Sequence, residues 1–356
     1  MTIYPGFSTD RMDAVFALSS RVSAMVQVEA AVAAAQGTAG DIPEDAATAI
    51  VAACAEPVGV EVLAQGWQIG TPVLPLLDAL KARLPESARP FIHHGLTTQD
   101  VVDTAMMWLS SNAIHHLHDL SGDAASTLRA IIKRSGSVAT EARSFLQPAD
   151  VTTVGFRVAR WLDQLDRATT RLDSTETPVQ LGGLIGDRMS IADDVVDAVA
   201  ERLGLDSRMP WHTDRTPVIA VVNAVVDLAR WAAKVGVDIA HLVQLGEIST
   251  RAGGSSAAAG KRNPIDSMRA TAAAEACLGV ASVVLHAKPH ELERGLGSWH
   301  AEWFALPLVF QTAGAAMEAI GVALGSLDVE DSSLEVADDR RIAADAYVTS
   351  ILEQSP

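Results

Sequence analysis

Apolar residues in this chain recur at helical spacing over long, uninterrupted segments. The longest segment runs from Val218 to Arg251, with no proline after Pro217 and a single glycine before its last turns. Another begins near Thr98, a good N-cap residue, and continues to about Arg134. Alternation of apolar and polar residues, which is typical of a half-buried strand, is almost absent. Helices of this length normally pack side by side, so the sequence predicts an all-α fold built as a long-helix bundle.

Further helices are predicted on the same grounds, with glycines and prolines marking most of their ends. Their expected ranges are 10–36, 43–57, 71–84, 153–173, 190–203, 264–287 and 299–327, while the glycine-rich residues 175–188 are expected to form a loop. In the first of these helices, Asp13, Arg21 and Glu29 fall between the apolar positions. We expect an N-terminal helical domain (1–97), a central bundle (98–330) and a short C-terminal helical segment (331–356). The many apolar residues on the long helices also predict that neighbouring subunits cover part of the surface.

Composition excludes several classes of function. Hydrophobic residues make up 49% of the 356 residues, which is ample for a large core, and the formal net charge is -17. Nucleic-acid binding needs a basic face and is therefore disfavoured. Two cysteines, Cys54 and Cys277, have no spacing typical of a disulfide framework or a zinc site. The first residues lack the pattern of a signal peptide, and we expect no membrane span and a cytoplasmic location.

One glycine- and alanine-rich segment also carries polar residues suited to catalysis. Residues 253–264 read Gly-Gly-Ser-Ser-Ala-Ala-Ala-Gly-Lys-Arg-Asn-Pro. Tiny residues let a backbone approach a ligand closely, and Lys261 and Asn263 offer donors for a carboxylate. The segment resembles the mobile loop of the fumarase/aspartase superfamily, in which a loop serine is the catalytic base. The resemblance implies that role for Ser255 or Ser256 and family practice favours Ser255, although the Ala-Ala-Gly centre departs from the family's Met-Pro-x.

A second polar segment stands at the start of the long helix. Residues 93–100 read His-His-Gly-Leu-Thr-Thr-Gln-Asp. Hydroxyls, an amide and the free N–H groups of a helix start converge here and form a natural carboxylate site, although an ordinary N-cap has the same composition. The segment resembles the first characteristic region of the same superfamily. The resemblance implies that substrate is bound by His93, Thr97, Thr98, Gln99 and Asp100.

A third segment both matches the superfamily and departs from it. Residues 143–155 read Arg-Ser-Phe-Leu-Gln-Pro-Ala-Asp-Val-Thr-Thr-Val-Gly and resemble its second region, which implies substrate contacts from Gln147 and Thr152. Fumarase-like and argininosuccinate-lyase-like members place a histidine where this chain has Phe145, and its glutamate partner where this chain has Met268. Such a pair serves one proton transfer. Its absence at both positions favours a reaction whose leaving group is already a stable anion, such as a carboxylate.

Two tryptophan-rich segments narrow the resemblance. Residues 210–215 read Pro-Trp-His-Thr-Asp-Arg, and residues 293–303 read Glu-Arg-Gly-Leu-Gly-Ser-Trp-His-Ala-Glu-Trp. A single tryptophan is ordinarily a core residue, but both segments resemble the bacterial 3-carboxy-cis,cis-muconate cycloisomerases, and the likeness covers roughly residues 8–325. It implies a homotetramer with each active site built from three subunits. It also implies further substrate-binding residues, namely His212, Arg215 and Arg294.

The resemblance implies the interconversion of 3-carboxy-cis,cis-muconate, a small tricarboxylate, and 4-carboxymuconolactone, a step in protocatechuate breakdown that needs neither cofactor nor metal. One alternative is an elimination like that of adenylosuccinate lyase, which shares the bundle and the Thr-Thr-Gln-Asp-like region. The missing His–Glu pair and the tryptophan-rich segments argue against it. Another alternative is a non-catalytic relative with a structural or binding role. The altered loop centre supports that reading, whereas the presence of Ser255, Lys261 and Asn263 argues against it.

Overall fold

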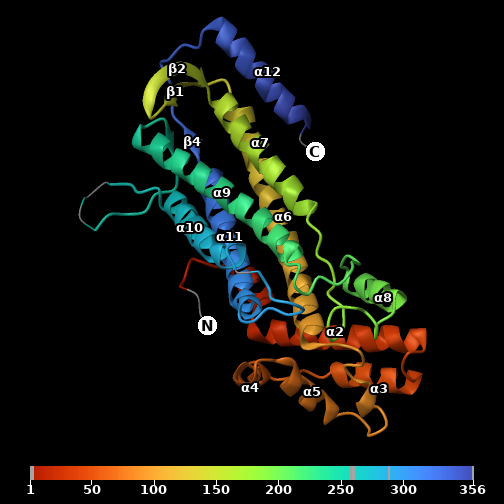
Figure 1. The fold of residues 1–356 in the computed structure, drawn as a ribbon. Helices are drawn as coiled ribbons and strands as arrows, with labels where there is room; N and C mark the ends of the chain where they lie inside the picture. Colours follow the sequence, from red (N-terminus) through yellow and green to blue (C-terminus); the bar gives the residue numbers. More distant parts are fainter. Residues whose placement is uncertain (1–3, 257, 259–260, 288, 355–356) are drawn as a thin grey trace.

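Five long helices form the body of the protein (Figure 1). The computed structural model describes residues 4–256, 258, 261–287 and 289–354. Helices α9, α10 and α11 pack against one another, α6 packs on α7 and α11, and α7 also contacts α9. The expected all-α bundle is therefore confirmed. The bounds of these helices are α6 (Thr98–Ser135), α7 (Val154–Asp173), α9 (Thr216–Gln244), α10 (Ile265–Leu285) and α11 (Ser298–Gly325).

The N-terminal helices lie across one end of this bundle (Figure 1). Helix α2 (Leu18–Ala39) packs on the start of α6, and α8 (Asp193–Leu203) and α3 (Glu44–Cys54) pack on α2. Helices α4 (Glu61–Ile69) and α5 (Val73–Lys81) pack together beside them, and a short 3-10 turn (Arg89–Phe91) leads back to α6. Because α2 is buried between these layers, its polar side chains need internal partners. This point bears on the site described below.

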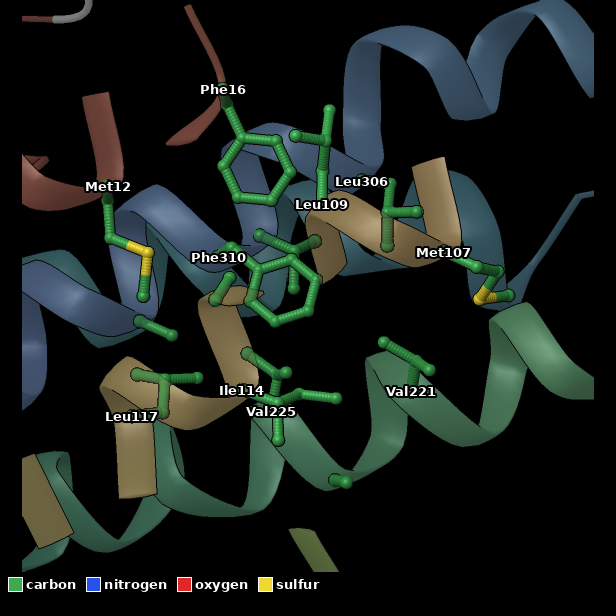
Figure 2. Close-up of a cluster of buried hydrophobic side chains, with 14 of the residues drawn as sticks. Met12, Phe16, Met107, Leu109, Ile114, Leu117, Val221, Val225, Leu306 and Phe310 are labelled. Atoms are coloured by element: carbon green, nitrogen blue, oxygen red, sulfur yellow. The ribbon is translucent and has the colours of Figure 1, made fainter. Parts of the chain in front are cut away.

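The core of the bundle is apolar and closely packed (Figure 2). Phe310 of α11 is fully buried and stacks on Phe16, with 5.4 Å between the ring centroids. Leu117 of α6 and Val225 of α9 are also fully buried in this region. Buried aliphatic and aromatic side chains of this kind contribute about 1.5–3 kcal/mol each through burial. The apolar residues that recur at helical spacing therefore pack together in a single continuous core.

A two-stranded hairpin interrupts the helical pattern after α6. Strands β1 (Ala139–Ser144) and β2 (Gln147–Thr153) pair antiparallel, and Thr153 then caps α7 by accepting a hydrogen bond from the N–H of Phe156. The expectation of an almost strand-free chain missed this hairpin. Most of its residues are exposed or only partly buried, so the strands never needed the apolar alternation that marks a half-buried sheet.

The chain ends on the outside of the bundle. A second short pairing joins β3 (Ile248–Ser249) to β4 (Asp328–Val329). Helix α12 (Asp338–Gln354) then packs along α7 and against β2 (Figure 1). This helix lies in the segment expected to form a short C-terminal helical element.

Several predicted helix boundaries need correction. The helix expected over 10–36 is broken into α1 (Asp10–Val15) and α2, because Phe16 and Ala17 leave helical geometry. Helix α4 was not predicted, and α9 ends at Gln244 rather than Arg251. The N-cap of α6 is Thr97, one residue before the predicted Thr98.

Two helices of the bundle are strongly apolar. By length and composition alone, α10 and α11 are long and apolar enough to cross a membrane. The most apolar window of α11 is 67% buried within the protein, as expected for a core helix, whereas that of α10 is only 33% buried. Helix α10 therefore presents apolar side chains at the surface of a single chain.

Candidate active site

The predicted site residues lie in three separate places on one chain. The first, which we call the helix-start cluster, gathers around the beginning of α6. The second, the hairpin pair, lies on β2. The third, the serine loop, connects β3 to α10. Their members are, in that order, His93, Thr97, Thr98, Gln99, Asp100, His212, Arg215 and Arg294; Gln147 and Thr152; and Ser255, Ser256, Lys261 and Asn263.

Helix α6 holds the first two groups far apart. The helix-start cluster lies at its N-terminus and the hairpin follows its C-terminus, as Figure 1 shows. The 38 residues of α6 span about 57 Å, given the standard rise of an α-helix. No side chain bridges such a distance, so these two groups cannot act on the same small molecule within one chain.

Helix α9 separates the serine loop from the helix-start cluster in the same way. Arg215 is the N-cap of α9, whose 29 residues span about 44 Å. The loop begins beyond the other end, where Ile248 pairs with Val329. From Ile248 to Ser255 the chain reaches about 24 Å at full extension. Ser255 therefore stays roughly 20 Å or more from the start of α9 in the same chain.

Asp100 organises the backbone around the helix-start cluster. Its carboxylate is fully buried and closes a capping box with Thr97, accepting the backbone N–H of Thr97 at 2.9 Å. It also accepts the backbone N–H groups of Gly182 and Gly183, each at 2.9 Å, and lies 3.2 Å from Nε2 of His212. Asp100 thus fixes the glycine-rich loop and His212 against the helix, and its oxygens have no open side toward a ligand.

Arg215 is held in a buried network of charges. Its guanidinium donates to both oxygens of Asp103, at 2.7 and 3.2 Å, and to both oxygens of Glu302. It also donates to the backbone carbonyl of His212 and lies over the ring of Trp211, 4.7 Å from the centroid. These five bonds match the five N–H groups of an arginine, so no donor remains for a substrate carboxylate.

The charge of Arg215 is secured by its partners. Burial works against the charged guanidinium, but Asp103 and Glu302 outweigh burial and raise the pKa of Arg215 above its ordinary value. Trp299 and Gln99 add hydrogen bonds to Asp103 at 2.9 and 3.0 Å. The network therefore cross-links α6, α9 and α11 beneath the cluster. Asp103 and Glu302 were not predicted from the sequence, although Glu302 lies within the tryptophan-rich segment that carried the resemblance.

Other members of the helix-start cluster keep open donors. The guanidinium of Arg294 donates to Oγ1 of Thr97 at 2.6 Å and to the carbonyl of Leu184 at 3.3 Å, and no described residue supplies it with a carboxylate. The hydroxyl of Thr98 lies 2.9 Å from that of Thr71. His93 keeps Nε2 open. A guanidinium, an imidazole nitrogen and a partly exposed hydroxyl in this cluster suit the binding of a small polycarboxylate.

A buried glutamate stands behind His93. Nδ1 of His93 lies 2.6 Å from Oε1 of Glu29 on α2. The Glu29 side chain is 1% exposed. It is therefore buried, even though it falls between the apolar positions of the helical pattern. The only sequence signal for such a partner is a charged residue within an otherwise apolar helix.

The hairpin pair lies beside an exposed turn. Thr152 is buried and Gln147 is exposed. Phe145 occupies the tip with a positive φ of 51° and a relative exposure of 99%. A phenylalanine facing water so completely is costly in an isolated chain. The turn therefore presents an apolar ring to solvent in a single chain.

The serine loop is closed at its base. Gly253 and Asn263 exchange backbone hydrogen bonds at 2.9 and 3.0 Å, and the amide of Asn263 also donates to the carbonyl of Gly254 at 3.0 Å. Ser255 is half-buried and its Oγ accepts the backbone N–H of Ala258 at 3.2 Å, whereas Ser256 and Lys261 are exposed. The altered loop centre falls partly on Ala259 and Gly260, which lie outside the described residues.

An ion pair anchors the other side of that loop. Arg251 donates twice to Asp266, at 2.8 and 2.6 Å, and Asp266 is 2% exposed. This pair joins the loop to the start of α10. Met268, two residues further along α10, is 59% exposed. Within the described part of the chain, no group of three or more His, Cys, Asp or Glu side chains is arranged to hold a metal ion.

Comparisons with known proteins agree on one family. The family model described as Lyase matches residues 6–279. The 3-carboxy-cis,cis-muconate cycloisomerases of Pseudomonas putida and Pseudomonas aeruginosa are 32% and 34% identical to this chain, over 91% of it and over 81% and 74% of their own lengths. The crystal structure of 3-carboxy-cis,cis-muconate lactonizing enzyme from Pseudomonas putida superposes with a TM-score of 0.84 at 29% identity, covering 91% of this chain and 76% of that one.

Proposed function

This chain belongs to the lyase family of the fumarase/aspartase superfamily, and we propose that it is a 3-carboxy-cis,cis-muconate cycloisomerase that interconverts its substrate with 4-carboxymuconolactone. The observation that carries the proposal is the pair Phe145 and Met268, where elimination enzymes of this superfamily need a histidine and a glutamate. An elimination that expels an amine or hydroxide must protonate its leaving group. Opening and closing a lactone moves a carboxylate, which needs no such proton.

The reaction adds a carboxylate oxygen and a proton across a carbon–carbon double bond of the same molecule. Attack by one substrate carboxylate forms the ring C–O bond. The electron pair of the double bond moves to the carbon next to a second carboxylate and spreads into it as an aci-carboxylate. A proton then reaches that carbon and completes the lactone, so substrate and product are isomers. The barrier falls when fixed donors stabilise the second negative charge as it forms.

The serine loop supplies the groups for these steps. Lys261 and the backbone N–H groups of the loop are suited to stabilise the aci-carboxylate, and Asn263 holds the base of the loop in shape. Ser255 delivers the proton to carbon and takes it back in the reverse direction. Ser255 is half-buried while Ser256 is exposed, and a shielded hydroxyl is the easier one to activate through nearby positive dipoles.

The helix-start cluster divides into binding and supporting residues. His93, Thr98 and Arg294 carry the open polar groups and would hold substrate carboxylates, while the buried Thr97 accepts a hydrogen bond from Arg294 and holds that guanidinium in place. Gln99, Asp100, His212 and Arg215 are buried in the networks described above and would support that surface from beneath. Gln147 and Thr152 would complete the site from the hairpin.

A complete site requires more than one copy of the chain. Within one protomer the length of α6 separates the helix-start cluster from the hairpin pair, the length of α9 separates it from the serine loop, and Phe145 projects from the hairpin. The most apolar window of α10 is only 33% buried in one chain, which leaves a surface for packing against other protomers. These features support a homotetramer in which the long helices of residues 98–330 form a common core and three subunits contribute to each site.

The direct test is an ultraviolet assay of the purified protein with 3-carboxy-cis,cis-muconate. Loss of the conjugated-diene absorbance, with the lactone identified by NMR, is the expected outcome. Ser255→Ala should lower kcat by about 10²–10⁴-fold, while Ser256→Ala, which removes an exposed hydroxyl of the same loop, serves as the matched control. Turnover of adenylosuccinate or argininosuccinate in place of the muconate, or full activity of both serine variants, would overturn the proposal.

A further inference from the structure

Glu29 is a buried carboxylate whose hydrogen-bonding partner among the described residues is His93. It lies on α2 with 1% of its side chain exposed, and Oε1 is 2.6 Å from Nδ1 of His93. No lysine or arginine forms an ion pair with it among the described residues. A buried carboxylate is costly unless it is paired and hydrogen-bonded. The contact with His93 is therefore the one that satisfies this carboxylate in the described part of the chain.

The backbone around His93 is also built to hold this contact. His93 has a φ of +62°, a conformation that costs a side chain other than glycine energy and persists only when its surroundings enforce it. Gln36, seven residues after Glu29 and so on the same face of α2, donates from Nε2 to the carbonyl of His94 at 2.9 Å. Gln36 is likewise 1% exposed. Two buried polar side chains of α2 thus fix the His-His turn from beneath.

We propose that Glu29 is a positioning residue that fixes the orientation of the His93 ring for contact with substrate. Glu29 accepts the Nδ1–H of the imidazole, so that Nε2 is the ring nitrogen left for a ligand. The His93 side chain is 18% exposed, and no described residue bonds to Nε2. The contact with Glu29 therefore fixes the direction in which Nε2 points. This inference rests on the proposed function, since it assigns His93 to an anionic substrate.

The pairing has a consequence for substrate affinity. A ring that can turn presents Nε2 to the substrate only part of the time, so a fixed ring binds more tightly. A carboxylate acceptor holds the Nδ1–H more strongly than a neutral acceptor does. Glu29 therefore acts on substrate affinity through His93, without touching the substrate.

Two substitutions separate charge from packing. Glu29→Gln keeps an oxygen that can accept from Nδ1–H but removes the negative charge, whereas Glu29→Leu removes both. We expect Glu29→Gln to raise KM about tenfold with kcat changed by less than about threefold, and Glu29→Leu to raise KM further. Gln36→Leu is the matched control on the same helix face, because it loosens the turn without contacting His93.

The decisive comparison is a double-mutant cycle with His93→Gln. If Glu29 acts through His93, Glu29→Gln should add nothing to the KM of the His93→Gln enzyme. Additive effects, or equal losses of kcat/KM from Glu29→Gln and Gln36→Leu, would show that Glu29 is merely structural and would overturn the inference.

A measurement without turnover keeps this test independent of the assigned reaction. The ring-nitrogen NMR signals of His93 should report a proton held on Nδ1 in the wild-type protein and a different signal pattern, without that fixed contact, in Glu29→Leu. Propane-1,2,3-tricarboxylate, a tricarboxylate that cannot cyclise, should bind more weakly to Glu29→Gln than to the Gln36→Leu control. If the muconate is not turned over but these signals differ as expected, the reaction is misassigned and the role of Glu29 stands. Unchanged ring signals would refute it.

Discussion

Mixing two inactive variants should restore activity if the active site is shared between subunits. Arg294→Glu inactivates the helix-start cluster because it places a negative charge opposite an anionic substrate. Ser255→Ala inactivates the serine loop. Each variant alone should lose about a hundredfold or more in kcat/KM. Within one chain these residues are held apart by α9, whose 29 residues span about 44 Å. A working site must therefore take its helix-start cluster and its serine loop from different protomers.

The size of the recovery follows from counting subunits. In tetramers reassembled from an equal mixture, a given site has an intact helix-start cluster with a chance of one in two, and an intact serine loop with the same independent chance. About a quarter of the sites should then be fully active if each comes from a different subunit. The assay is diene loss after dissociation and reassembly, with native mass spectrometry confirming that hybrid tetramers have formed.

A control pair uses two variants of the same loop. Ser255→Ala mixed with Lys261→Ala always leaves the serine loop of a site defective, so this mixture should stay inactive however the subunits combine. Verified hybrids of the first pair that show no recovery would refute the shared site. Recovery by the control pair would show that reassembly, and not complementation, restores activity.

Three further predictions concern buried charges and thiols. Glu247 is paired with Arg143 and Thr140; burial opposes its charge, but these hydrogen bonds lower its pKa below the ordinary 4.5. Glu247→Gln should therefore lower the free energy of unfolding by about 2 kcal/mol above pH 4.5. This loss should shrink as the pH falls through the lowered pKa, which urea unfolding at a series of pH values and a fixed protein concentration would measure. Arg215→Met leaves two buried carboxylates unpaired and should destabilise the protein by about 3–5 kcal/mol, and an unchanged urea midpoint would contradict the network. Burial raises the pKa of Cys54 and of Cys277 to about 12, so both thiols should resist a disulfide reagent at pH 8 until the protein unfolds.

The helical pattern of the sequence predicted the bundle because the long helices bury continuous apolar stripes. Where burial is one-sided and extended, as in α7 from Val154 to Asp173, the predicted and observed bounds nearly coincide. The hairpin of residues 139–153 escaped prediction for the opposite reason. Few residues of its strands are buried, so their sequence does not alternate between apolar and polar residues.

The sequence predicted which residues belong to the candidate site, but not where they lie in the fold. The resemblance of five segments to one superfamily supplied the residue types, and the comparisons confirm that family. The sequence could not show that Asp100 and Arg215 form their hydrogen bonds with neighbouring groups of the protein. It also gave no reason to pair Glu29 with His93, because 64 positions separate them in the chain.

The sequence by itself therefore determined the class of fold, the family and the chemical groups available, since these follow from local spacing and residue type. Only the tertiary structure decided which donors are open, which charges are already paired and which groups can meet. Those properties depend on distances between segments remote in the chain, and here two rigid helices, α6 and α9, set the distances. They keep the helix-start cluster apart from the hairpin pair and the serine loop in one protomer, and for that reason the proposed site needs its neighbours.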